Sequence, residues 1–252
     1  MTRHLKLFAL TVALSWMPTL AQQVQPLPDA LRVFDQEHDL AKKEYELLSI
    51  TQQHPESGPA LLALAQKTQF SDTRWMAMRG MRDVQFRGCG SFLKQELKSS
   101  DALVRSNAAR VIGDLGFRSA DEDLSAMFKA EHDPRAVEQA SLSLRVLNVR
   151  TSAPLIRRKI PLFTGQTRAW LLQAVGSVGD KRDVPLIAGS LDSPDWASSI
   201  MAADALEQLT GVNFGPLQYA PQSLPSPRTL KARAWWAQHR ARWPSCNDCH
   251  FK

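Results

Sequence analysis

The sequence predicts an all-α fold, an α-solenoid of stacked antiparallel helix pairs. The first observation is a repeat of 31 or 32 residues between the hydrophobic residues that end successive helices: Val84, Leu115, Leu147, Val178 and Leu209. The second observation is that apolar residues between these ends recur at helical spacing. A fixed period of this length is typical of repeat architectures, in which each unit buries its apolar face on the next one.

The ends of the first helix in each repeat support this register. Fifteen residues before each helix stop stand residues suited to N-caps: Asp101, Asp133, Thr164 and Asp195. Directly after the hydrophobic ends, Gly116, Asn148 and Gly179 are residue types that adopt the left-handed conformation in which many helices stop. We therefore expect tight turns at these three residues.

A second helical run follows each of these turns. Apolar residues continue at helical spacing in two such runs, at Leu124, Met127 and Phe128 and at Val184, Leu186, Ile187 and Leu191. Pro154 and Pro185 fit the first turns of these helices, because the amide that proline lacks has no intrahelical partner there. Each unit is expected to be a helix, a tight turn and a second helix.

The repeat over residues 101 to 116 resembles a HEAT repeat of the short bacterial, phycobilisome-lyase-like type. The resemblance rests on Asp101, Val104, Arg105, Ala108, Ala109, Gly113, Leu115 and Gly116, and it extends over residues 70 to 212. It implies a scaffold or binding surface and does not imply bilin lyase activity. The arginine of the family pattern is present as Arg74, Arg105 and Arg168. Val137 and Ser199 replace it in the other copies, so we expect any ladder of Asp and Arg bonds to be interrupted.

The segments on either side of this array have a different composition. Residues 22 to 69 are expected to form capping helices that cover the open apolar end of the array. Residues 213 to 227 are rich in proline and glycine, which predicts a loop. Residues 228 to 252 contain a tryptophan-bearing helix from Arg228 to Trp243 and a short tail, and they resemble the end of many exported bacterial HEAT proteins.

Residues 1 to 21 have the pattern of a signal peptide. Arg3 and Lys6 precede an apolar run from Leu7 to Trp16, and Thr19-Leu20-Ala21 forms a small-x-small cleavage site. The run is too short to span a bilayer and no second long apolar run follows, so we expect no membrane span. The mature chain should begin at Gln22 and be periplasmic or secreted. The alternative is an N-terminal anchor that stays uncleaved.

Charge and motif content narrow the classes of function. The chain has 31 Lys and Arg against 25 Asp and Glu, and loss of Arg3 and Lys6 with the signal peptide lowers its formal charge from +6 to +4. This charge is far from the clustered basic stripe of a nucleic-acid-binding protein. The sequence has no Ser/His/Asp order, phosphate-binding glycine loop or paired-carboxylate motif, so we expect a protein that is not an enzyme.

The last seven residues contain the sharpest chemical motif. Cys246, Cys249 and His250 form a CxxCH sequence, the spacing used to attach c-type haem. The two thiols can add to the vinyl groups of one haem, while His250 becomes an axial ligand of its iron. Only Phe251 and Lys252 follow. Burial of the haem would therefore need the preceding helix, a dimer interface or residues of a longer reading frame.

The last helix offers a further candidate ligand. One face of this helix carries Ala232, Trp236, His239 and Trp243. In one interpretation, the tryptophans pack on the final repeat and His239 is a partly exposed, hydrogen-bonded neighbour. In the other, this face lines the haem and His239 is the distal ligand. Without haem, the tail would be a redox-thiol site or would supply three zinc ligands, with His239 as the nearest fourth ligand.

Two other features have alternative interpretations. The run Arg157-Arg158-Lys159 is either a solvated helix face or a docking patch for an acidic partner. The isolated Cys89 is expected to be a small buried apolar residue.

The leading interpretation is an exported HEAT-like scaffold that binds a protein partner on an extended face and carries one covalent haem c. The first alternative is a periplasmic monohaem electron carrier that docks its partner through the array. The second is a zinc or redox-thiol protein without haem.

Overall fold

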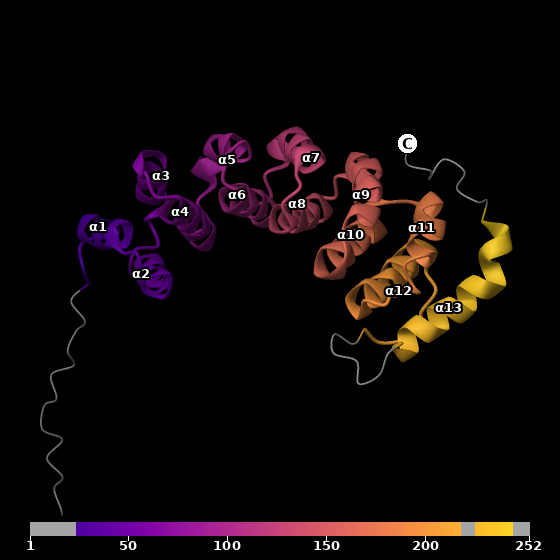
Figure 1. The fold of residues 1–252 in the computed structure, drawn as a ribbon. Helices are drawn as coiled ribbons and strands as arrows, with labels where there is room; N and C mark the ends of the chain where they lie inside the picture. The colour runs from indigo at the N-terminus through magenta and orange to yellow at the C-terminus, as the bar shows by residue number, and fades with distance from the viewer. Residues whose placement is uncertain (1–23, 218–224, 244–252) are drawn as a thin grey trace, which may run out of the picture.

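The chain folds into a curved row of helices. The computed structural model describes residues 24–217 and 225–243, and every regular element in these two ranges is a helix. The helices follow one another along an elongated arc (Figure 1). The predicted all-α solenoid is therefore confirmed. No helix in the two described ranges is long and apolar enough to cross a membrane.

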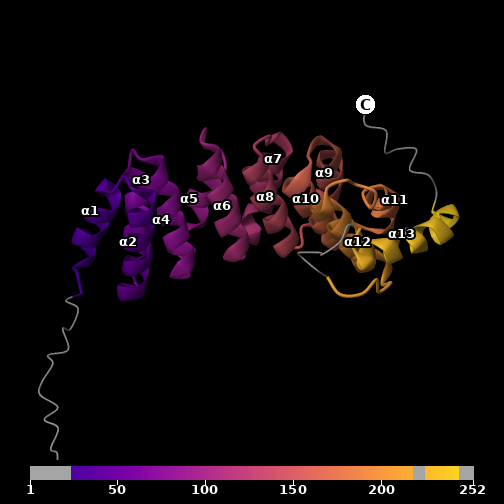
Figure 2. The ribbon, with the colours of Figure 1, turned by 60° about the horizontal axis from the view of Figure 1, so that its bottom comes forward.

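The arc has two rows of helices (Figure 1). The outer, convex row consists of α1 (Leu27–Gln36), α3 (Gly58–Lys67), α5 (Gly90–Glu96), α7 (Asp121–Ala130), α9 (Ala153–Lys159) and α11 (Val184–Ala188). The inner, concave row consists of α2 (Leu40–Gln53), α4 (Ser71–Asp83), α6 (Ala102–Asp114), α8 (Pro134–Val146), α10 (Gly165–Val178) and α12 (Trp196–Thr210). The last helix, α13 (Pro227–His239), packs on α12. The helices lie across the long axis of the array, so their connections gather at its two edges (Figure 2).

Each odd-numbered helix packs on the even-numbered helix that follows it, and the even-numbered helices also pack on one another. The packed unit is therefore an outer helix with the inner helix that follows it, such as α5 with α6 or α7 with α8. The sequence pattern predicted the other grouping, an inner helix with the outer helix that follows it, such as α6 with α7. Helix α3 of the expected capping segment packs on α4 in the same way.

Two glycines let the inner helices approach each other closely. A Cβ on Gly113 of α6 would lie 2.9 Å from the Cα of Ser143 in α8. A Cβ on Gly176 of α10 would lie 2.7 Å from the Cα of Ala205 in α12. Ser143 also donates its Oγ–H to the Ala109 carbonyl at 2.8 Å. The inner row is thus held together by contacts that leave no room for a larger residue.

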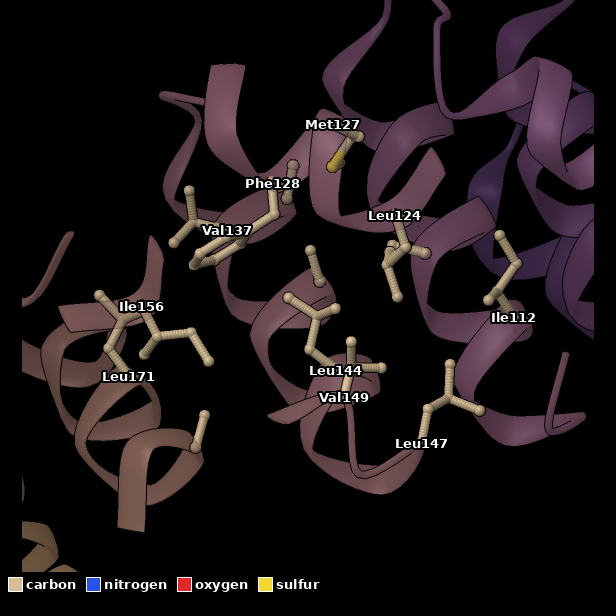
Figure 3. Close-up of a cluster of buried hydrophobic side chains, with 14 of the residues drawn as sticks. Ile112, Leu124, Met127, Phe128, Val137, Leu144, Leu147, Val149, Ile156 and Leu171 are labelled. Carbon is tan, nitrogen blue, oxygen red and sulfur yellow. The ribbon is translucent and has the colours of Figure 1, made fainter. Parts of the chain in front are cut away.

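The hydrophobic core runs along the array between the two rows (Figure 3). Phe128 of α7, Leu144 of α8, Ile156 of α9 and Leu171 of α10 are all fully buried. Burial of each such side chain contributes about 1.5–3 kcal/mol. Because the side chains come from successive pairs, each pair depends on its neighbours for a core.

Three of the four expected N-caps are confirmed. The carboxylates of Asp101, Asp133 and Asp195 accept hydrogen bonds from backbone amides at the starts of α6, α8 and α12. Thr164 precedes α10, but its side chain makes no capping hydrogen bond, so that expectation is wrong. Carboxylate caps dominate because they are stronger acceptors and favour the positive end of the helix dipole.

The expected left-handed turns are confirmed at Gly116 (φ 71°) and Asn148 (φ 53°). Gly179 is different, because its φ is −79°. A Cβ at this position would lie 2.4 Å from the Val175 carbonyl oxygen, so a close approach requires glycine there. Gln85 has φ 54° and occupies a left-handed position that the sequence did not predict.

Replacing Gln85 with Gly should raise the free energy of unfolding by about 0.5–1 kcal/mol, because a side chain in the left-handed region is strained. The matched control is Gln95→Gly, at an exposed position of α5, where glycine costs a helix about 1 kcal/mol. Denaturant titrations followed by circular dichroism measure both changes. A lower stability of Gln85→Gly than of the parent would contradict the left-handed turn.

Candidate functional site

The predicted cofactor residues Cys246, Cys249 and His250 lie outside the described residues, as does the predicted signal peptide. The described part of the site is α13 and the 3-10 turn Arg240–Arg242 that extends it. The helix begins at Pro227, one residue before the expected start, and the Ser226 side chain caps it through the Thr229 amide. This helix leads the chain into the tail.

Two arginines fix α13 on the end of the array. Arg228 is 6% exposed and forms ion pairs with Asp204 and Glu207 of α12, at 3.1 and 3.0 Å. Arg233 donates to the Leu191 carbonyl at 2.7 Å and pairs with Asp192 at 3.0 Å. Because both arginines bind elements of the last pair, the position of α13 relative to the array is set by charge-assisted hydrogen bonds.

His239 is held by Trp235. Its Nδ1 lies 2.8 Å from the Trp235 carbonyl oxygen, and the two rings stack with centroids 4.9 Å apart. Since a carbonyl oxygen only accepts, Nδ1 carries a proton, and in the neutral imidazole Nε2 keeps its lone pair. Nε2 is the atom that could ligate iron or zinc, and the bond at Nδ1 is the usual support for such a ligand. Trp235 was not predicted from the sequence, although its spacing of four residues from His239 could have indicated it.

The other aromatic residues of this helix pack on the final repeat. Ala232 is fully buried, and Trp236 and Trp243 are partly buried against the core. Trp235 contacts the Phe214 ring edge-on, with centroids 5.9 Å apart. Within the described residues, the tryptophans pack on the final repeat and His239 is partly exposed and hydrogen-bonded.

The described residues alone do not assemble a metal site. No group of three or more His, Cys, Asp or Glu in residues 24–217 and 225–243 is placed to hold a metal ion.

Cys89 is fully buried, as expected. Burial raises the pKa of its thiol to about 11. The thiol donates to the Phe86 carbonyl at 3.0 Å. Because the thiolate is the reactive form, Cys89 is inert at neutral pH.

The run Arg157-Arg158-Lys159 does not form one solvated face. Lys159 is 5% exposed, and its ammonium donates to the Glu131 carbonyl at 2.6 Å and lies 5.4 Å from the Phe128 ring centroid. Arg157 is paired with the fully buried Asp183. Of the three, Arg158 alone is exposed. The expectation of a solvated face is therefore wrong for Lys159, whose pKa is lowered by burial and partly restored by the charge of Glu131.

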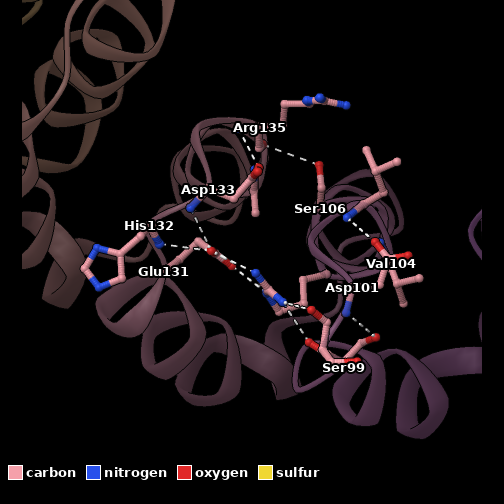
Figure 4. Close-up of polar contacts among 12 residues, drawn as sticks. Ser99, Asp101, Val104, Ser106, Glu131, His132, Asp133 and Arg135 are labelled. Carbon is pink, nitrogen blue, oxygen red and sulfur yellow. Dashed lines mark hydrogen bonds and ion pairs between the residues drawn. The ribbon is translucent and has the colours of Figure 1, made fainter.

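An ion pair between Arg105 and Glu131 joins two consecutive helix pairs. Figure 4 shows Glu131 beside His132 and Asp133. The Glu131 carboxylate accepts from Arg105 Nε at 2.6 Å and Nη2 at 2.9 Å, and from the backbone amides of His132 and Asp133. Arg105 also donates to the Ser99 carbonyl at 2.8 Å. Burial alone would raise the pKa of Glu131, but the hydrogen bonds from Arg105 and the two amides hold it below its ordinary value.

The hydrogen bonds of the equivalent arginines go to neutral oxygens instead of a carboxylate. Arg74 donates to the Thr68 carbonyl and Arg168 to the Ser190 hydroxyl. These three arginines therefore do not form a continuous ladder of acid and arginine bonds, in keeping with the expected interruption.

No protein-family model matches this chain, and no curated protein matches it either. The packed helix pairs are compatible with a helical repeat protein.

Replacing Glu131 with Gln should lower the free energy of unfolding at neutral pH by about 2 kcal/mol, because charge-assisted hydrogen bonds are lost. The folded-state pKa of Glu131 lies below its ordinary value, so its contribution is present above that ordinary value and is lost as the pH falls through the lowered pKa. Urea titrations across the acid range should show this loss in the parent and a smaller one in Glu131→Gln. The control is Glu122→Gln, at an exposed residue. Identical acid profiles for the parent and Glu131→Gln would contradict the assignment.

Proposed function

We propose that this protein is an exported α-solenoid of HEAT-like repeats that binds a protein partner on its concave surface and carries one covalent haem c on its tail. The observation that carries the first part is the inner row of helices, which presents one continuous surface from α4 to α10 (Figure 1). The signal-peptide pattern supports export. The CxxCH pattern supports haem attachment.

The concave surface has the side chains that protein interfaces favour. Each inner helix packs on an outer helix and on its inner neighbours, so its accessible stripe faces the concave side. On α4, Trp75 is half-buried and the Arg79 guanidinium lies 5.8 Å from its ring centroid. On α10, Trp170 is half-buried. Tryptophan and arginine are enriched among the residues that dominate binding energy, which supports a protein partner on this surface.

The haem would be held by residues of the C-terminal segment. Cys246 and Cys249 would form its thioether bonds, His250 would be its proximal ligand, and His239 would be its distal ligand through Nε2. When bound, such a haem takes up and releases one electron. The hydrogen bond from His239 to the Trp235 carbonyl supports the distal assignment, because it leaves Nε2 as the ligand atom. Trp243 would supply apolar cover.

The same hydrogen bond favours a second candidate, a periplasmic monohaem electron carrier. In that case the array docks the redox partner and electron transfer is the main activity. A zinc or redox-thiol site is the third candidate.

A photo-cross-linking residue in place of Asn107 of α6 or Leu142 of α8 should form adducts with a partner in the cells that naturally make the protein. Both positions lie in helices of the inner row and are half-buried. The controls are Ala126 and Lys129, which are exposed on α7 of the convex row. Mass spectrometry of the adducts measures the difference. Adducts from the convex positions alone would contradict a concave binding surface.

Protein made in a host with active cytochrome c maturation should carry one covalent haem on the peptide that contains Cys246 and Cys249. Alanine at either cysteine should weaken or abolish haem retention, because one thioether bond is lost. His239→Ala should change the iron absorption spectrum while the haem stays attached. His132→Ala, at an exposed position of the array, should change neither haem content nor spectrum.

The outcomes separate the three candidates. A mature mass without haem overturns haem attachment and leaves the zinc or redox-thiol site. An attached haem with an unchanged spectrum in His239→Ala overturns the distal ligand alone.

A further inference from the structure

Four turns on one edge of the array carry a cation at the same position. They join an inner helix to the next outer helix, and each contains a 3-10 segment: Arg87–Cys89, Arg118–Ala120, Arg150–Ser152 and Lys181–Asp183. The first residue of every segment is Arg or Lys. Lys and Arg make up 31 of 252 residues, about one in eight, so composition does not explain a cation in four of the five described turns that join an inner helix to the next outer helix. The fifth turn, between α2 and α3, has Glu56 instead of a cation. We call these four cations, Arg87, Arg118, Arg150 and Lys181, the turn ridge.

The backbone fixes the placement of the turn ridge. In the first three turns, the cation follows by two residues a left-handed residue, which is Gln85, Gly116 or Asn148. The same local conformation therefore presents Arg87, Arg118 and Arg150 in the same direction. All four ridge side chains are exposed.

Several acids near this edge have partners other than the ridge cations. Within the described ranges, no acidic residue forms an ion pair with a ridge cation. Asp83 is paired with Arg82, and Asp114 with Arg82 and Arg110. In the fourth turn, Asp180 is paired with Arg182 at 2.6 Å. Arg118 lies near Asp121, whose pKa is raised by burial and partly lowered by the charge of Arg118.

Helix dipoles do not account for the turn ridge. Each ridge cation stands between the C-terminus of an inner helix, which favours a cation, and the N-terminus of an outer helix, which disfavours one. The lysines of the opposite edge have a different explanation. Lys67 is the last residue of α3, Lys98 follows the end of α5, and Lys129 lies in the last turn of α7. The dipoles of these outer helices are sufficient to explain that row of lysines.

We propose that the turn ridge binds an extended acidic segment of the protein partner. Neighbouring helices in such an array are about 8–10 Å apart. A chain in the extended polyproline II conformation rises about 3.1 Å per residue and has three residues per turn, so acidic side chains at every third residue would lie on one face and meet successive ridge cations. The segment would be about ten residues long. The assignment rests on the proposed function, because the segment belongs to the partner of the concave surface.

A protein segment fits the turn ridge better than a nucleic acid does. Phe86 and Phe117 stand beside Arg87 and Arg118, but both rings are half-buried against the array. Single-stranded nucleic acids are held by accessible aromatic rings on which bases stack, together with cations. The turn ridge supplies the cations without such rings.

Fluorescence anisotropy with a labelled peptide that has Glu at every third of about ten residues tests the proposal. The parent should bind it, and a peptide with Gln in place of Glu should bind far more weakly. Reversal of the four ridge cations to Glu should weaken binding about tenfold or more, since four ion pairs are each replaced by a repulsion. High salt should weaken parent binding in the same direction.

The matched control variant reverses Lys67, Lys98, Lys129 and Arg135, which are exposed on the opposite edge and carry the same total charge. It should keep parent affinity. A second ridge variant with Gln at all four positions separates lost binding from misfolding, and circular dichroism checks both variants.

Three results would overturn the assignment. They are no peptide binding by the parent, equal weakening in the ridge and control variants, and tighter ridge-dependent binding of a single-stranded oligonucleotide. The cross-links from Asn107 and Leu142 do not depend on this peptide, so the proposed function stands or falls separately.

Discussion

The close packing of the inner helices on one another is the constraint on which the rest of this structure depends. Gly113 and Gly176 stand where a Cβ would meet the backbone of the next inner helix. With this row tightly packed and the outer helices on its far side, the array curves and exposes the inner row as a concave surface (Figure 1). The same stacking places equivalent turns side by side along one edge, which is why four cations in separate repeats can act on one ligand.

Position in the repeat decides what a cation does in this protein. Lys159 lies inside the array, where it donates to the Glu131 carbonyl and cannot contact a partner. Arg105 joins two pairs through the Glu131 carboxylate, and loss of either partner would leave a poorly solvated charge. The ridge cations follow the 31- or 32-residue period of the repeat, and they lie in exposed turns. Lysines and arginines inside the array thus hold the helix pairs together, whereas those in the exposed turns remain available for binding.

The sequence predicted the all-α array and its repeat length well, because a period of 31 or 32 residues is set by whole helix pairs. Local geometry was less predictable: Gln85 is left-handed without the usual residue type, and Gly179 is required by a close approach. The repeat register could have predicted the burial of Lys159, because Lys159 lies 32 residues after Met127, which is also buried. The haem motif stays a prediction, since its residues lie outside the described ranges, while the support of His239 by Trp235 came from the structure.

Hydrogen–deuterium exchange of the protein with and without the acidic peptide tests most directly whether the array binds an acidic segment along its turn edge. Bound peptide should slow exchange in the four ridge turns, at residues 84–89, 115–120, 147–152 and 178–183. The loops at the opposite edge, including residues 97–101 and 131–133, should exchange as in the unbound protein. Slower exchange confined to those opposite loops, or no change at any turn, would contradict binding along this edge.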